Sequence, residues 1–179
     1  MSAFEKEALD LFVYQFEHSN VYRSFCDLMH VSPSDVKSLV QIPFIPISFF
    51  KTHRISCEKN DEIVFESSGT GGVTSKHHVA SLAQYEQSFQ EGFSHFYGNP
   101  SDYHILALLP GYLERPNASL VYMCQDLIRR AKKEHSGFYL NQFDALHKAL
   151  TALSKQEKPT LLIGVSFAAL DKKKFLEEE

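Results

Sequence analysis

A loop rich in glycine and hydroxyl residues is the stretch of this sequence best suited to chemistry. It spans residues 66–76, ESSGTGGVTSK, and follows the apolar run EIVFE. Glycine permits positive φ and a close approach of backbone N–H groups to a ligand, while hydroxyls and a lysine offer hydrogen bonds and charge to phosphate oxygens. The loop is therefore predicted to bind phosphate through Ser67, Ser68, Gly69, Thr70, Gly71, Gly72 and Lys76. The alternative interpretation is a glycine-rich hairpin turn between EIVF and HHVA whose hydroxyls contact only water.

Two widespread phosphate-binding motifs do not fit this loop. A Walker loop requires a lysine directly after its last glycine, but Gly72 is followed by Val73 and Thr74. The dinucleotide fingerprint opens a helix, whereas this loop leads into HHVA, which has the composition of a strand. Both motifs are therefore excluded.

The loop resembles the phosphate-binding loop of the adenylate-forming enzymes, in which two hydroxyl residues, Gly, Thr, a further hydroxyl residue and Gly precede a Lys. Residues 67–70 and Gly72 match that order, whereas Gly71 replaces a hydroxyl residue and Lys76 lies one position late without a preceding proline. Three further segments, in order, resemble the acyl-protein synthetases of the LuxE type: IPFIPISFFKTHRI (42–55), LLPGYLERPNASLVYM (108–123) and LLIGVSFAALD (161–171). From about residue 40 onward, the chain is similar to this family.

The resemblance implies ATP-dependent activation of a fatty acid or a related carboxylate. The carboxylate would attack the α-phosphate of ATP to form an acyl-adenylate, and the acyl group would then pass to a thiol and supply a partner acyl-CoA reductase. The loop would bind the β- and γ-phosphates, and Mg²⁺ would accompany ATP with few protein ligands. No catalytic residue is assigned, and neither is the thiol: Cys26 and Cys124 lie in apolar helical patterns, and Cys57 precedes the loop.

Length and composition predict a globular chain and agree with the cytoplasmic enzyme piece that the resemblance implies. The chain has 179 residues, 44% of them hydrophobic, and a net charge of −4, which argues against nucleic acid as a partner. A basic run at residues 129–133 suits the last turn of a helix. The acidic N-terminus MSAFEKEALD is unlike a signal peptide, no apolar run is long enough to span a membrane, and three unevenly spaced cysteines fit a reducing compartment.

The order of elements predicts an α/β fold in two parts. Residues 1–56 are expected to form a helical cap over 3–29 and then an extended strap punctuated by prolines. Residues 57–179 are expected to form a partial nucleotide-binding domain, because alternating strands and helices imply a mostly parallel sheet with flanking helices, as in the N-terminal region of adenylate-forming enzymes. The expected strands are 62–66, 77–81, 103–109, 138–140 and 160–165; the expected helices are 82–97, 117–133, 142–154 and one from Ser166, with Ser81 and Asn117 as N-caps.

A serine nucleophile is the rival chemistry. The segment GVSFA (164–168) follows an apolar strand, as in a nucleophile elbow. In that fold a histidine follows the serine, and none follows Ser166. Ser166 is therefore interpreted as a helix N-cap, and a serine-dependent acyl hydrolase or transferase is the less favoured hypothesis.

The nine histidines show no spacing typical of metal ligands. His77 and His78 are adjacent, so they are expected to point to opposite faces of a strand. His53 and His104 are interpreted as structural residues.

Members of the resembling family are longer, so this chain is expected to lack their adenine-binding motif and their thiol-bearing part. A truncated chain, one half of a split enzyme and a degenerate remnant all stay open. We expect the 179 residues alone to be a poor adenylating enzyme and to form a homodimer through an exposed strand edge. The second hypothesis is a non-catalytic α/β binding module serving a partner subunit; Gly71 and the displaced Lys76 favour it, whereas residues 67–70 favour the enzyme.

Overall fold

The computed structural model describes residues 2–67, 73–109, 117–156 and 158–165. The chain divides into two compact units, residues 1–82 and 83–179, and each is described by itself. The domain boundary expected after residue 56 stays a prediction, because contacts within one chain do not test which part folds alone.

The first unit begins with two helices, α1 (Ala3–His18) and α2 (Asn20–Leu28). The Ser2 hydroxyl accepts a hydrogen bond from the Glu5 N–H at 3.1 Å and caps α1. Ser19 ends α1 and caps α2, which turns the chain between the helices. One small core joins them to the segment that follows, and its buried members are Phe12, Tyr22, Cys26 and Val36.

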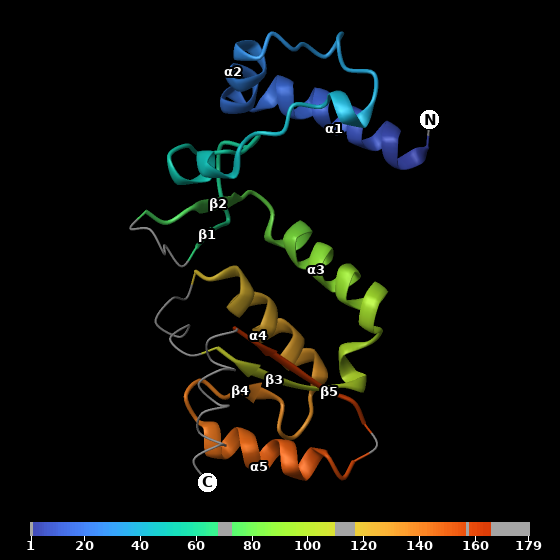
Figure 1. The fold of residues 1–179 in the computed structure, drawn as a ribbon, viewed down its shortest axis with the longest axis vertical. Helices are drawn as coiled ribbons and strands as arrows, with labels where there is room; N and C mark the ends of the chain where they lie inside the picture. Colours follow the sequence, from blue (N-terminus) through green and yellow to red (C-terminus); the bar gives the residue numbers. More distant parts are fainter. Residues whose placement is uncertain (1, 68–72, 110–116, 157, 166–179) are drawn as a thin grey trace. The chain divides into compact units, whose positions relative to one another are not determined.

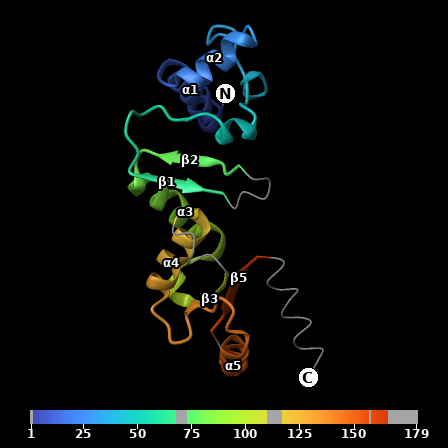
Figure 2. The same ribbon diagram turned by 90° about the vertical axis from the view of Figure 1, so that its left-hand side faces the viewer.

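Two short 3₁₀ helices, η1 (Leu39–Gln41) and η2 (Ile47–Lys51), lie in the proline-containing strap. The Tyr22 hydroxyl donates to the Pro43 carbonyl at 2.6 Å and so ties the strap to α2. The unit ends in an antiparallel pair, β1 (Ile63–Glu66) and β2 (Lys76–Val79), in which Ile63 faces Val79 and Glu66 faces Lys76 (Figure 2).

The second unit is an α/β layer structure. Its elements are α3 (Leu82–Tyr97, beginning at the junction), η3 (Pro100–Asp102), β3 (His104–Leu108), α4 (Ser119–Ala131), β4 (Gly137–Phe138), α5 (Phe143–Leu153) and β5 (Thr160–Gly164). The three strands form a parallel sheet in the order β4-β3-β5. A mostly parallel sheet with flanking helices is therefore confirmed, and so is the α/β class.

Strand β3 is buried on both faces and organises this unit. Leu106 and Leu108 pack against α5, whereas Ala107 and Leu109 pack against α4. The alternation follows the two-residue period of a strand, and it places α4 and α5 on opposite faces of the sheet (Figure 1). The continuous apolar run YHILALL reflects this double burial.

The N-cap expected for α4 is wrong, and several other expected bounds, among them those of β2, β4 and α5, differ by one or two residues from the observed ones. Asn117 does not cap α4: the helix begins at Ser119, its N-cap is Ala118, and no side chain caps it. Ala118 is buried in the core, and its carbonyl accepts the first bond of the helix from the Tyr122 N–H at 3.1 Å. Core packing thus sets the start of α4. The helix expected from Ser166 lies outside the described residues.

Within the described residues, no helix combines the length and the apolar character needed to cross a bilayer.

The core around β3 gives a direct stability test. Leu146 on α5 is fully buried against Leu106 and Leu108, so Leu146→Ala should lower the free energy of unfolding by about 2–5 kcal/mol through lost burial and a cavity. The matched Leu162→Ala variant changes a residue that is 43% exposed and should cost less than about 1 kcal/mol. Urea denaturation measures both; equal losses would contradict the assignment of the core.

Candidate functional site

The base of the predicted phosphate loop is closed by two hydrogen bonds. The Ser67 N–H donates to the Ser75 carbonyl at 3.0 Å, and the Ser75 N–H donates to the Ser67 Oγ at 2.9 Å. These bonds continue the β1–β2 ladder by one step and bring the two ends of the loop together. Ser68, Gly69, Thr70, Gly71 and Gly72 lie outside the described residues, so their part in a site stays a prediction.

The hydroxyl of Ser67 has a hydrogen that it can donate to a ligand. It accepts the Ser75 N–H, and a hydroxyl that accepts one bond can still donate its own hydrogen. Ser67 can therefore fix the loop base and donate to a phosphate oxygen at the same time.

Lys76 stands opposite Glu66 at the mouth of the loop. Its Nζ lies 3.8 Å from Glu66 Oε1, and the two side chains are 54% and 42% exposed. A pair so long and so exposed contributes at most about 1 kcal/mol. Glu66 therefore keeps the ammonium near the loop without holding it firmly, and a phosphate can compete for it.

A carboxylate next to the hairpin joins the strap to β2. Asp61 Oδ1 accepts from Arg54 Nη2 at 2.6 Å, and Asp61 Oδ2 accepts from His78 Nδ1 at 2.8 Å. The Arg54 hydrogen bond lowers the pKa of Asp61; burial acts in the opposite direction, and the His78 hydrogen bond adds to the lowering. Arg54 and His78 are 24 positions apart in the sequence, so this carboxylate connects distant segments.

An aromatic contact joins the same two segments: the Phe50 ring meets the His77 ring edge-on with 6.3 Å between centroids. Within the strap, Phe49 stacks on His53 with 5.0 Å between centroids. Burial, with help from the nearby His78, lowers the pKa of His77, so His77 is neutral at pH 7. His77 and His78 thus contact different partners on opposite faces of β2, as expected of neighbours in a strand.

The three cysteines do not form activated thiols. Cys26 and Cys124 are completely buried, and burial raises the pKa of Cys124 to about 11. Burial also raises the pKa of Cys26 and of the half-buried Cys57. A nucleophilic cysteine needs a lowered pKa, so none of these three thiols has the properties of an acyl acceptor.

His104, at the start of β3, lies buried in the second unit. It is 5% exposed, and within the described part of the chain neither ring nitrogen has a hydrogen-bond partner. Burial lowers its pKa; nearby Gln156 acts in the opposite direction but falls outside hydrogen-bonding geometry, so the imidazole is neutral at pH 7. Among the described residues, no three His, Cys, Asp or Glu side chains cluster to hold a metal ion.

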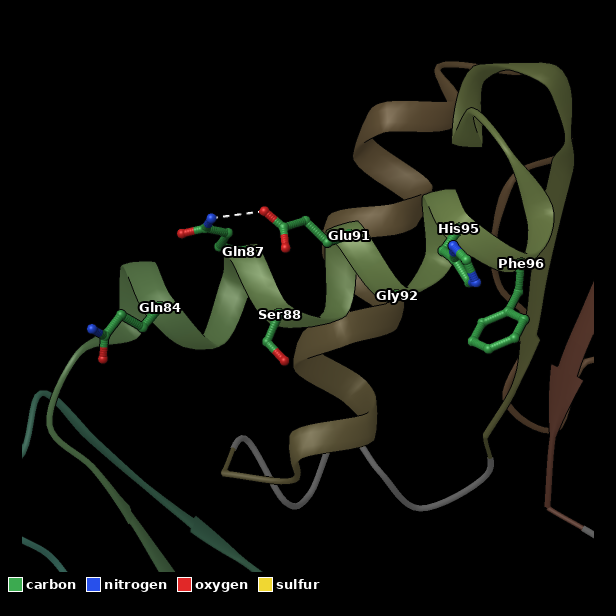
Figure 3. A pocket seen from close by; sticks show the side chains of 7 residues that line it. All are labelled: Gln84, Gln87, Ser88, Glu91, Gly92, His95 and Phe96. Carbon is green, nitrogen blue, oxygen red and sulfur yellow. Dashed lines mark hydrogen bonds between the residues drawn. The ribbon is translucent and has the colours of Figure 1, made fainter. Parts of the chain in front are cut away.

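A hollow of about 660 Å³ on α3 is not a candidate for this chemistry. All of its lining comes from one helix: Gln84, Gln87, Ser88, Glu91, Gly92, His95 and Phe96. Figure 3 shows these side chains along one stretch of α3, with the Gln87 amide donating to Glu91 at 2.7 Å. A binding site normally has groups converging from several elements, which this helix surface lacks.

Two charged clusters were missed by sequence reasoning. The Arg54–Asp61–His78 cluster has no readable signal, because its members come from a strap, a loop and a strand. The second centres on buried Asp126 in α4, which binds Arg129 and Arg130. Its signal was present as i,i+3 and i,i+4 spacing, but the same spacing is common on solvated helix faces.

Asp61 is predicted to stabilise the first unit in a pH-dependent way. Its folded pKa is lowered, so its contribution is complete above the unfolded pKa of about 3.9 and is lost as pH falls through the folded value. Asp61→Asn should therefore cost about 1–2 kcal/mol at pH 7, and this cost should shrink progressively as the pH falls below about 4 toward the lowered folded pKa of Asp61. The control, Asp10→Asn, breaks an exposed pair with Lys6 and should change stability by less than about 0.5 kcal/mol. Denaturation from pH 7 to pH 3 measures this; a pH-independent loss would contradict it.

Comparison with known proteins agrees with the resemblance of the segment at residues 42–55 and of most of the segment at residues 108–123. The family model described as "Acyl-protein synthetase, LuxE" matches residues 2–119, which include α1, α2, the strap, the hairpin, α3 and β3. The match reaches further toward the N-terminus than the expected start near residue 40, and it ends before the segment 161–171. No curated protein matches this chain, and no solved structure matches it either. Because the family model covers well over half of the sequence, the chain belongs to the LuxE acyl-protein synthetase family.

Proposed function

We propose that this chain binds the phosphates of ATP at its β1–β2 loop and takes part in activating a fatty acid or a related carboxylate as an acyl-adenylate. The observation that carries the proposal is the closed loop base, in which Ser67 and Ser75 bond to each other beside Lys76, in a member of the LuxE family. The residues proposed to contact phosphate are Ser67, Ser68, Gly69, Thr70, Gly71, Gly72 and Lys76.

The described residues fit a phosphate ligand. The Ser67 hydroxyl has a hydrogen to donate, and the Lys76 ammonium is loosely held by Glu66. Cross-strand bonds fix the loop base before ligand arrives, so less ordering is needed on binding. When bound with Mg²⁺, ATP supplies the α-phosphorus that a carboxylate oxygen attacks and the pyrophosphate that leaves. The hydroxyls and the lysine would hold the β- and γ-phosphates in line and balance charge on the leaving group.

The acyl acceptor is proposed to be a thiol outside these 179 residues. Cys26, Cys57 and Cys124 all have a raised pKa, and two of them are completely buried. A partner acyl-CoA reductase is the proposed recipient of the acyl group, and the proposed location is the cytoplasm.

Two other functions make different predictions. A non-catalytic binding module or a split-enzyme subunit is favoured by Gly71 and the displaced Lys76, and this function needs no phosphate contact at the loop. Ser166 chemistry has no supporting observation, because that residue lies outside the described part.

Homodimerisation is also a proposal. Within the described residues β5 pairs only with β3, and Leu162 on it is 43% exposed. A strand with one free side can recruit a second copy.

Substitutions in the loop separate the enzyme from the binding module. Lys76→Ala and Thr70→Ala should each lower fatty-acid-driven ATP–pyrophosphate exchange, or MgATP binding where exchange is too slow, by about tenfold or more, because each removes a phosphate contact. The melting temperature should stay within about 2 °C of the parent value, since the pair lost at Lys76 is exposed.

Lys59→Ala is the matched control, since it removes an exposed lysine from the same unit. Unchanged exchange and MgATP binding in Lys76→Ala and Thr70→Ala would show that the loop is an ordinary turn.

A further inference from the structure

A second basic site lies at the C-terminal end of α4. It is a pocket of about 380 Å³ formed by α4, α3 and the segment before β3, and its lining residues are Gln90, Ser94, Asn99, Pro100, Arg129, Arg130 and Lys132. Three of these seven are cations, in a chain whose net charge is −4. The pocket is therefore positively charged, whereas the chain as a whole has a net negative charge.

Buried Asp126 orients the two arginines of the pocket. Its side chain is 5% exposed, and it accepts hydrogen bonds from Arg129 Nη2, from Arg130 Nε at 2.6 Å and from Gln90 Nε2 at 3.1 Å. Burial alone would raise the pKa of Asp126, but the hydrogen bonds from Arg130 and Arg129 outweigh it and lower the pKa. A buried, ionised carboxylate thus binds both guanidinium groups.

The guanidinium groups retain donors for a ligand. Each carries five N–H donors, and Asp126 takes only some of them. The Arg129 side chain is 70% exposed and the Arg130 side chain is 42% exposed, so the remaining donors are open to solvent. A planar fork held in place on one side is the geometry that binds two oxygens of an anion on the other.

The positive charge at the C-terminal end of α4 exceeds what is needed to balance the helix dipole. The lining residues of the pocket include three cations and no carboxylate; buried Asp126 and a helix C-terminus equivalent to about half a charge offset part of this positive charge, and Asp102 acts on the neighbouring Lys133. Lys132 occupies the C-cap with φ of 48°, a left-handed conformation that favours Gly or Asn. The neighbouring Lys133 has its pKa lowered chiefly by Lys158, so positive charge continues past the pocket.

The pocket is separate from the sheet edge where α/β ligands usually bind. α4 follows β3 and leads back to a parallel strand, so its C-terminal end lies near the start of β3, beside η3 (Figure 1). Ligands of open α/β sheets bind instead at the carboxyl ends of the strands. The basic pocket is thus not part of that edge.

We propose that this pocket binds a phosphate group. Its concave form suits a compact anion, and its donors are two oriented guanidinium forks, a lysine and the Ser94 hydroxyl. A flat acidic surface of a partner protein would bind to exposed charges and would not need a hollow between two helices. This inference is independent of the proposed function of the β1–β2 loop, because its residues belong to different elements.

Residue-resolved NMR of the ¹⁵N-labelled chain, titrated with pyrophosphate, tests the proposal. Saturable shifts are expected at the amides of Gln90, Ser94 and Asn99 and at Arg130 Nε. Shifts at Ser67, Ser75 and Lys76 would report the β1–β2 loop instead, so failure of one site is distinguishable from failure of the other. A parallel titration with ADP identifies the source: tighter binding than pyrophosphate at the same residues indicates a nucleotide, and equal binding indicates the phosphate group alone.

Charge variants give the matched comparison. Lys132→Asn removes a cation and suits the left-handed C-cap, so the fold should be retained while the affinity at the pocket falls by about three- to tenfold. Lys148→Gln removes an exposed lysine from α5 on the other face of the sheet and should leave that affinity unchanged.

Three results would overturn the proposal. They are no saturable shift at the pocket with pyrophosphate, equal weakening in Lys132→Asn and Lys148→Gln, and saturation of the pocket by a polyglutamate peptide but not by pyrophosphate.

Discussion

The reciprocal hydrogen bonds between Ser67 and Ser75 are the constraint on which the proposed site depends. They fix how far apart the two ends of the loop lie, and Glu66 and Lys76 face each other one step below. A loop whose ends were free would have to be ordered by its ligand, at a cost in affinity. The same ladder that stabilises the hairpin would therefore prepare the loop for the proposed phosphate ligand.

The hairpin is itself held by the strap that precedes it. Asp61 bonds to Arg54 and His78, and Phe50 packs against His77 on the other face of β2. The segment 42–55, which carries part of the family resemblance, is thus physically joined to β2, the strand that begins at Lys76 where the loop segment ends. The proline-containing strap, whose only helices in its described residues are the short η1 and η2, thus braces the strand from which Lys76 projects.

The second unit is held together by burial of its central strand. Strand β3 is buried on both faces, so α4 and α5 each find an apolar surface to cover. Within this frame α4 turns its apolar stripe toward the sheet and carries a buried carboxylate at its edge. Asp126 then lets two arginines stay close together at the helix end without excessive repulsion.

The sequence allowed the strongly patterned parts to be predicted. Helix α3 was expected at its observed bounds, because a long run of helix formers follows Ser81, and the apolar run of β3 marked a buried parallel strand. The start of α4 was misplaced because burial of Ala118, a tertiary effect, overrides the capping preference of Asn117. The bonds of Asp61 could not be predicted, since they join segments with no periodic relation.

The central claim is that the β1–β2 loop binds the phosphates of ATP. A crystal structure of the chain with Mg²⁺ and a non-hydrolysable ATP analogue tests it most directly. The account predicts β- and γ-phosphate oxygens within hydrogen-bonding distance of Lys76 Nζ, of Ser67 Oγ and of backbone N–H groups between residues 67 and 75. A nucleotide bound elsewhere, with Lys76 still paired to Glu66 and no phosphate at the loop, would contradict it.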